Sequence, residues 1–155
     1  MNKIKFNFLL VLSFIVSAAI PNPPDLGVGS YVLYEPNTKK VLVSFNADEP
    51  VQPASLTKLM TSYVVADYIK EDFIRLDDTP KISIKAWKTE GSRMFIREGT
   101  KVAVSDLIKG MIIQSGNDAS VALAEHVAGS EENFAYLMNE YASQLGMQNS
   151  SFNNA

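Results

Sequence analysis

A serine and a lysine stand three residues apart in the segment "PASLTKLMT", residues 53–61. Apolar residues recur at helical spacing from Ser55 onward, so the sequence predicts a helix over residues 55–70 with Ser55 and Lys58 one turn apart on one face. A serine hydroxyl becomes an effective nucleophile when a neighbouring base removes its proton, and a lysine can be that base if burial lowers the pKa of its ammonium group. The pair therefore fits a nucleophile and its base, although a capping serine beside a solvated lysine has the same spacing.

A second polar group, Ser115-Gly116-Asn117, interrupts two helical patterns. Apolar spacing indicates one helix over 104–114 and another over 118–129. A turn between two helices can project the Ser115 hydroxyl and the Asn117 amide into one cleft, where the hydroxyl relays a proton and the amide binds a peptide carbonyl. Capping of the second helix is the structural alternative for the same residues, and the two roles are compatible.

The remaining elements are expected to position these two groups. Two β-rich runs around a turn cluster predict a hairpin over 28–46, and Ser130 opens a further helix over 130–146. Short strands are expected in the mixed region, at 81–84 and 92–96.

The N-terminus has the pattern of a secretory signal, with two lysines, an apolar run over 6–20 and cleavage expected after Ala18. The chain has no cysteine, which excludes disulfides, thiolate metal ligands and a cysteine nucleophile. His126 is the one histidine and is assigned a structural role, so no histidine metal cluster is possible. The formal net charge of -3 argues against a general nucleic-acid binder.

The segments "PASLTKLMT" and "LIKGMIIQSGNDASVALAEHVAGSEENFAYLMNEYASQLGM" closely resemble the low-molecular-mass penicillin-binding proteins of the D-alanyl-D-alanine carboxypeptidase family. This resemblance implies an α/β (α+β) architecture, the penicillin-binding-protein/β-lactamase-like transpeptidase fold, in which helices flank an antiparallel sheet. Residues 1–18 are then the signal peptide, and residues 19–155 are the N-terminal part of the catalytic domain.

The resemblance also implies a mechanism. Ser55 is the acylated nucleophile, Lys58 is its general base, Ser115 shuttles a proton, and Asn117 binds the substrate. The implied reaction removes the terminal D-alanine from peptidoglycan pentapeptides, and β-lactams are the implied inhibitors. Neither a metal nor an organic cofactor takes part, and the implied location is the periplasm or another extracytoplasmic compartment.

The family's third motif, Lys-Thr-Gly on a strand beside the cleft, does not occur in this sequence. Lys88-Thr89-Glu90 ends in glutamate and precedes Ser115, whereas the motif should follow it. We therefore expect a fragment that is poorly stable and inactive by itself, and whose membrane attachment would depend on the missing C-terminal region.

Two other functions remain open. A D,D-endopeptidase of the same superfamily would use the same residues, and a non-catalytic cell-wall-binding homologue would keep only the fold. A class A β-lactamase fits less well, because such enzymes have aspartate where this chain has Gly116.

Overall fold

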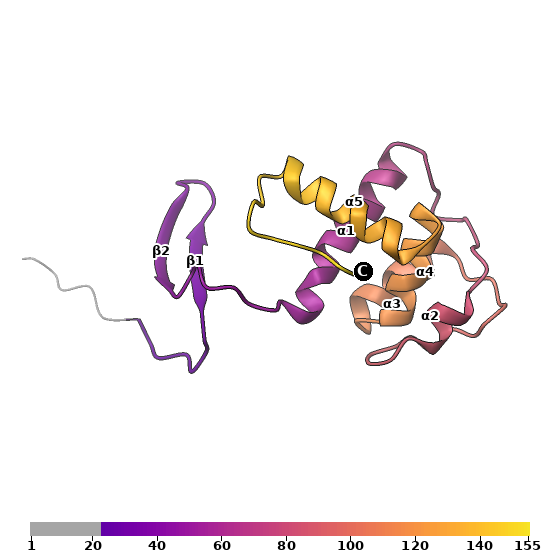
Figure 1. The fold of residues 1–155 in the computed structure, drawn as a ribbon, viewed down its shortest axis with the longest axis horizontal. Helices are drawn as coiled ribbons and strands as arrows, with labels where there is room; N and C mark the ends of the chain where they lie inside the picture. The colour runs from indigo at the N-terminus through magenta and orange to yellow at the C-terminus, as the bar shows by residue number, and fades with distance from the viewer. Residues whose placement is uncertain (1–22) are drawn as a thin grey trace, which may run out of the picture. The chain divides into compact units, whose positions relative to one another are not determined.

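The computed structural model describes residues 23–155, so the predicted signal peptide, residues 1–18, lies outside the described residues. The chain divides into two compact units with a boundary between Val51 and Gln52. The first described unit contains the strands β1 and β2, and the second contains the helices η1 and α1 to α5 (Figure 1).

The first unit is an antiparallel hairpin of β1 (Tyr31–Glu35) and β2 (Lys40–Phe45), as the sequence predicted. Tyr31 pairs with Phe45 at one end and Glu35 with Lys40 at the other. The pairing shifts between Leu33 and Tyr34. Such an irregularity increases the local twist of the ribbon.

The turn of the hairpin is organised by the carboxylate of Glu35. It accepts hydrogen bonds from the hydroxyl and the backbone N–H of Thr38, the latter at 2.6 Å, and from the backbone N–H of Asn37 at 3.1 Å. These donors, the Thr38 hydroxyl first, stabilise the ionised form and lower the pKa of Glu35 to about 2.

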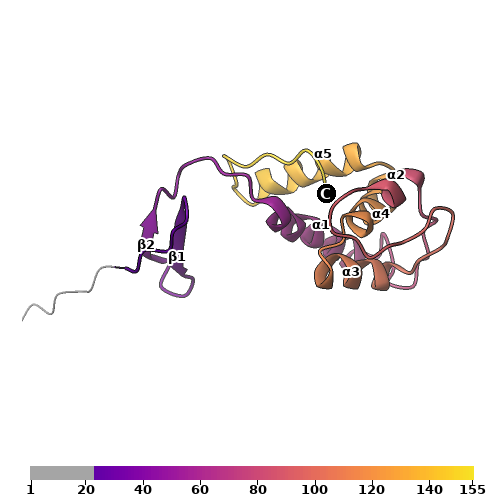
Figure 2. The same ribbon diagram turned by 90° about the horizontal axis from the view of Figure 1, so that it is seen from below.

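The second unit is built from one short 3₁₀ helix and five α-helices. Their bounds are η1 Ala54–Thr57, α1 Lys58–Lys70, α2 Ile84–Lys88, α3 Val104–Ile113, α4 Asn117–Ala128 and α5 Glu131–Gln144. Helix α4 contacts α1, α2, α3 and α5, and α5 lies along α1 in both views (Figures 1 and 2).

The central position of α4 follows from its sequence. Residues 118–124 are buried without interruption, and alanines make up three of them, so neighbouring helices can approach from several sides. Large apolar side chains from the surrounding helices complete the core; the fully buried ones include Val64, Leu107, Phe134 and Met138.

Helix ends in this unit have local causes. The Ser130 hydroxyl caps α5 by accepting the backbone N–H of Asn133 at 3.1 Å, as predicted. Gly129, with φ of 79°, ends α4 in the left-handed conformation that glycine adopts without steric cost.

The short strands predicted at 81–84 and 92–96 are wrong. Residues 84–88 form α2, and only an isolated bridge joins Lys81 to Lys101. Residues 92–96 have no strand partner; the N–H groups of Met94 and Ile96 bond instead to the carboxylate of Asp118. Within residues 23–155, no helix is long and apolar enough to cross a membrane.

Candidate active site

Ser55 lies in η1, one turn before the start of α1, where Lys58 is the first residue. The preceding residue, Ala54, has φ of 48°, which is unusual for a residue with a Cβ. Such conformations cost free energy and cluster at functional sites. Ser55 is exposed and Lys58 is partly buried, with 3.5 Å between Oγ and Nζ. This separation is at the long end for a hydrogen bond.

The ammonium group of Lys58 donates a hydrogen bond to Oδ1 of Asn117 at 2.7 Å. Burial lowers the pKa of Lys58, because a charged group loses hydration when it is covered by protein. A lysine whose pKa is lowered is neutral in a larger fraction of molecules, and the neutral amine can accept a proton from a serine.

Ser115 lies in the connection between α3 and α4, as predicted, and has φ of 52°. Its hydroxyl donates to Oγ of Ser55 at 3.0 Å across 60 residues of sequence. The turn therefore places a second hydroxyl directly on the candidate nucleophile.

Asn117 begins α4 and is bound from two sides. Its Nδ2 donates to the carbonyl of Glu90 at 2.7 Å, and its backbone N–H donates to the carbonyl of Ser92 at 2.7 Å. A Cβ on Gly91 would lie only 2.6 Å from Nδ2, so the chain passes too close to the amide for a larger residue. The Asn117 amide is thus fixed between Lys58 and residues 90–92.

The structure brings all four predicted residues together within the second unit. Hydrogen bonds run from Ser115 to Ser55, from Lys58 to Ser55, and from Lys58 to Asn117. This chain of groups can move a proton from Ser55 to Lys58 and can return one through Ser115. The Asn117 NH₂ has two N–H donors, and one of them is free of the Glu90 carbonyl to bind a substrate oxygen.

The resemblance to the family implies a loop near the nucleophile at residues 91–95, and in the structure the carbonyls of Glu90 and Ser92 bind Asn117. The sequence patterns did not show which side chains hold this segment in place. Asp118 has the residue type of a helix cap, but Gly116 is the N-cap of α4, and the Asp118 carboxylate accepts hydrogen bonds from the N–H groups of Met94 and Ile96. A short-range pattern cannot reveal a contact between residues more than twenty positions apart.

His126 makes its side-chain contact with Asp78 and not with any of the four motif residues. Its Nε2 contacts the Asp78 carboxylate at 3.1 Å, an arrangement that lowers the pKa of Asp78 together with the stronger effect of the Arg75 backbone N–H. Among the residues that the structure describes, no cluster of histidine and carboxylate side chains has the arrangement of a metal site.

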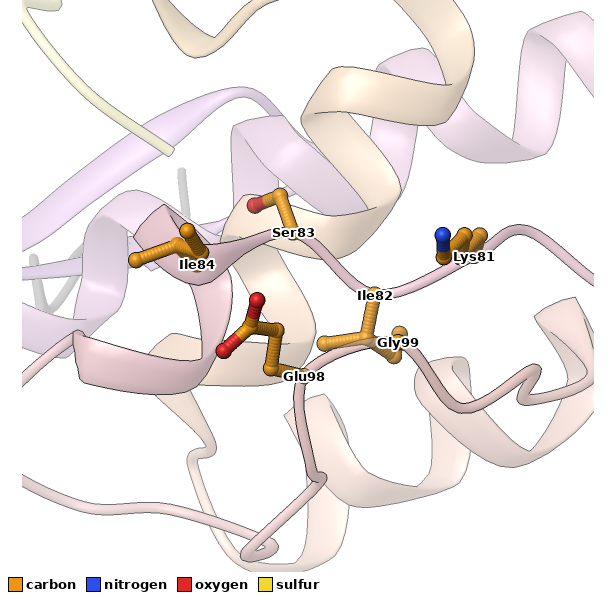
Figure 3. A pocket seen from close by; sticks show the side chains of 6 residues that line it. All are labelled: Lys81, Ile82, Ser83, Ile84, Glu98 and Gly99. Carbon is orange, nitrogen blue, oxygen red and sulfur yellow. The ribbon is translucent and has the colours of Figure 1, made fainter.

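A hollow of about 280 Å³ lies beside the start of α2. It is lined by Lys81, Ile82, Ser83, Ile84, Glu98 and Gly99 (Figure 3). The Glu98 carboxylate points toward Ser83 and Ile84 and away from Lys81 (Figure 3). None of the four motif residues lines it, so it is not part of the candidate active site.

Comparison with known proteins gives one consistent family. Residues 17–155 match the family described as D-alanyl-D-alanine carboxypeptidase, peptidase S11. The D-alanyl-D-alanine carboxypeptidase DacC of Escherichia coli K12 is 44% identical over 153 residues, which cover 95% of this chain and 38% of that protein.

Solved structures agree with the sequence relatives. Penicillin-binding protein 5 of Haemophilus influenzae superimposes with a TM-score of 0.82 at 42% identity, over 86% of this chain and 40% of that one. Penicillin-binding protein D2 of Listeria monocytogenes, in an ampicillin-bound form, superimposes with a TM-score of 0.71 at 25% identity. The match covers 84% of this chain and 53% of that one. These matches confirm the predicted transpeptidase fold, and the chain spans about 40% of the length of the first two proteins.

Proposed function

Because the chain belongs to the D-alanyl-D-alanine carboxypeptidase family, we propose that it supplies the acylating group of a serine carboxypeptidase that removes terminal D-alanine from peptidoglycan peptides. The observation that carries the proposal is the hydrogen-bonded set of Ser115, Ser55, Lys58 and Asn117.

The proposed acylation begins when neutral Lys58 takes the proton of the Ser55 hydroxyl. The Ser55 Oγ then forms a bond to the carbonyl carbon between the two D-alanines, and the C–N bond to the last D-alanine breaks. The proton from Ser55 passes through Lys58 and the Ser115 hydroxyl to the leaving amine, so that D-alanine departs neutral overall. Water then cleaves the ester and restores the serine.

Asn117 has two parts in this proposal. Its oxygen orients the Lys58 amine by accepting a hydrogen bond at 2.7 Å, and its second N–H binds a carbonyl of the peptide. A β-lactam would occupy the position of the D-alanyl-D-alanine unit and acylate the same oxygen.

We also propose that residues 19–155 are the N-terminal part of the catalytic domain and act outside the cytoplasmic membrane. The Lys-Thr-Gly strand that the family uses for the substrate carboxylate is not in this sequence. The 155 residues alone are therefore expected to release no D-alanine. Activity should be measured on the full-length protein, meaning this chain with any sequence that its gene adds after residue 155.

The test is covalent labelling of the full-length protein with a fluorescent penicillin, followed by mass spectrometry of the labelled peptide. The proposal predicts one label per molecule at Ser55 and no label in Ser55→Ala. A Ser55→Ala protein that labels as well as the wild type would refute the nucleophile.

Products from purified muropeptides then separate the reactions. Release of free D-alanine supports the carboxypeptidase, whereas cleavage of crosslinked dimers supports a D,D-endopeptidase. A folded full-length protein that neither labels nor cleaves would support the non-catalytic cell-wall-binding alternative.

A further inference from the structure

We propose that Asp118 is a positioning residue whose buried carboxylate holds residues 90–96 against the turn between α3 and α4, and thereby keeps the Asn117 amide on Lys58. The kinetic part of this inference rests on the proposed function, and its structural part does not.

The carboxylate of Asp118 is 1% exposed and has three backbone donors. Oδ1 accepts from the N–H groups of Met94 at 3.0 Å and Ala119 at 2.9 Å, and Oδ2 accepts from Ile96 at 3.2 Å. Burial of a carboxylate is costly unless hydrogen bonds replace its hydration. Two of its three donors belong to the segment 90–96. The hydrogen bonds that replace the hydration of the carboxylate therefore come mainly from this segment.

The segment 90–96 in turn obtains its order from α4. Met94 and Ile96 are alternate residues, so their N–H groups have the spacing that a partner strand would satisfy, and the two oxygens of Asp118 take the place of that strand. Between these donors lies Phe95, with φ of 64°, an uncommon conformation that persists only where the surroundings enforce it.

Asn117 adds two further links to the same segment, to the carbonyls of Glu90 and Ser92. Residues 117 and 118 thus hold the segment together, with two bonds each. The packing is close, since a Cβ on Gly116 would lie 3.0 Å from Oδ1 of Asp118 and 3.3 Å from the Met94 nitrogen.

This connection determines which end of the Asn117 amide faces Lys58. The oxygen faces the ammonium group because Nδ2 is held by the Glu90 carbonyl. If the segment moved away, the amide would lose that anchor and could rotate, so Lys58 would lose its fixed acceptor. We call the hydrogen bonds that join residues 117 and 118 to residues 90–96 the latch. The latch affects the reaction through Asn117 and does not touch a substrate.

The test is the variant Asp118→Asn in the full-length protein. It keeps the size of the side chain but replaces one acceptor oxygen with an NH₂ group, which faces an N–H donor. We expect the rate constant of Ser55 acylation by fluorescent penicillin, per labelled site, to fall roughly 10- to 100-fold, the scale of a lost hydrogen bond to a charged group. Because this rate constant is calculated only from the molecules that become labelled, it does not change if a smaller fraction of the variant is folded.

The matched control is Asp67→Asn. The Asp67 carboxylate is partly buried, whereas that of Asp118 is fully buried, and it too accepts a hydrogen bond, from the Tyr141 hydroxyl at 2.6 Å. This variant should lower the melting temperature while leaving the rate per labelled site within twofold of the wild type. A normal per-site rate in Asp118→Asn, or an equal loss in both variants, would overturn the kinetic role.

Amide hydrogen exchange tests the latch separately from the chemistry. In the wild-type chain, the amides of Met94 and Ile96 should exchange as slowly as amides within α4, and in Asp118→Asn they should exchange at least tenfold faster. Rapid exchange of both amides in the wild type would refute the latch even if Asp118→Asn did not fold. If the wild type did not label at Ser55, the proposed function would fail, and slow exchange would still support the latch.

Discussion

The two units of this chain differ most in how they bury apolar side chains. No residue from 23 to 51 is buried, whereas every buried residue of the described chain lies between Met60 and Ala142. In the hairpin, Val32 and Leu33 point to opposite faces and are 50% and 54% exposed. Two paired strands alone form no hydrophobic core, and an isolated hairpin of this kind is only marginally stable in water.

The helical unit, in contrast, completes a core from its own residues and contains all four motif residues. Lys58 and Asn117 lie in packed helices, Ser55 lies in the 3₁₀ helix directly before α1, and Ser115 lies in the turn between α3 and α4. The geometry of the proposed site is therefore a local product of residues 52–155. Four matched comparisons test this difference, and the first three use a control residue from the hairpin.

The largest effect should be kinetic. Replacing Lys58 with methionine removes the proposed base, so acylation of Ser55 in the full-length protein should fall roughly 100- to 10,000-fold. The exposed Lys40 in β2 is the matched control, and Lys40→Met should retain the wild-type rate. Stopped-flow labelling with penicillin measures both, and equal rates for the two variants would remove Lys58 from the mechanism.

The next effect concerns the core. Phe134 is 0% exposed and Phe45 is 48% exposed. Phe134→Ala should lower the free energy of unfolding of the chain by about 3–5 kcal/mol, because it removes buried area and leaves a cavity. Phe45→Ala should leave the same transition nearly unchanged. Urea denaturation followed by helical circular dichroism distinguishes them, and similar losses in both would contradict the division into a packed unit and an unpacked one.

A smaller loss is expected from a single hydrogen bond between α1 and α5. The Tyr141 hydroxyl donates to Asp67 at 2.6 Å, and burial, with the neighbouring carboxylate, raises the pKa of Tyr141. Tyr141→Phe should cost about 1 kcal/mol of unfolding free energy, since Asp67 can still reach water. Tyr34→Phe in the hairpin is the control, and an equal loss there would show that the bond adds nothing specific.

The smallest effect belongs to the hairpin turn. The pKa of Glu35 is lowered to about 2, so its stabilising hydrogen bonds are present above the ordinary glutamate pKa of 4.5 and are lost as the pH falls toward 2. The amide chemical shifts of Asn37 and Thr38 should therefore move between pH 4.5 and 2. Glu35→Gln should abolish this titration without changing the helical unit; shifts that persisted in Glu35→Gln would assign them to another group.

Much of the helical unit was predictable from sequence because its causes are local. Apolar spacing located α3, α4 and α5, and Ser130 marked the start of α5 correctly. Ser105 has the residue type of an N-cap, but α3 already begins at Val104 with Ala103 as its N-cap.

The wall of the site was not predictable in the same way. Residues 92–96 have strand-like composition, but their backbone hydrogen bonds go to a side chain on α4, and no local pattern reports that partner. Tyr63 and Tyr136 fall at the helical spacing that is typical of core aromatics, but they are 49% and 67% exposed. Helical periodicity shows which residues share a face, but tertiary packing decides whether that face is covered.

The most direct test of the proposed chemistry is the ionisation of Lys58 itself. An NMR titration of its Nζ, identified by comparison with Lys58→Met, gives the pKa in the folded chain. The proposal requires a value below the ordinary lysine pKa of 10.5, because a buried amine must be neutral to take the Ser55 proton. A value of 10.5 or higher would mean that Lys58 stays charged, and it would contradict its role as the base.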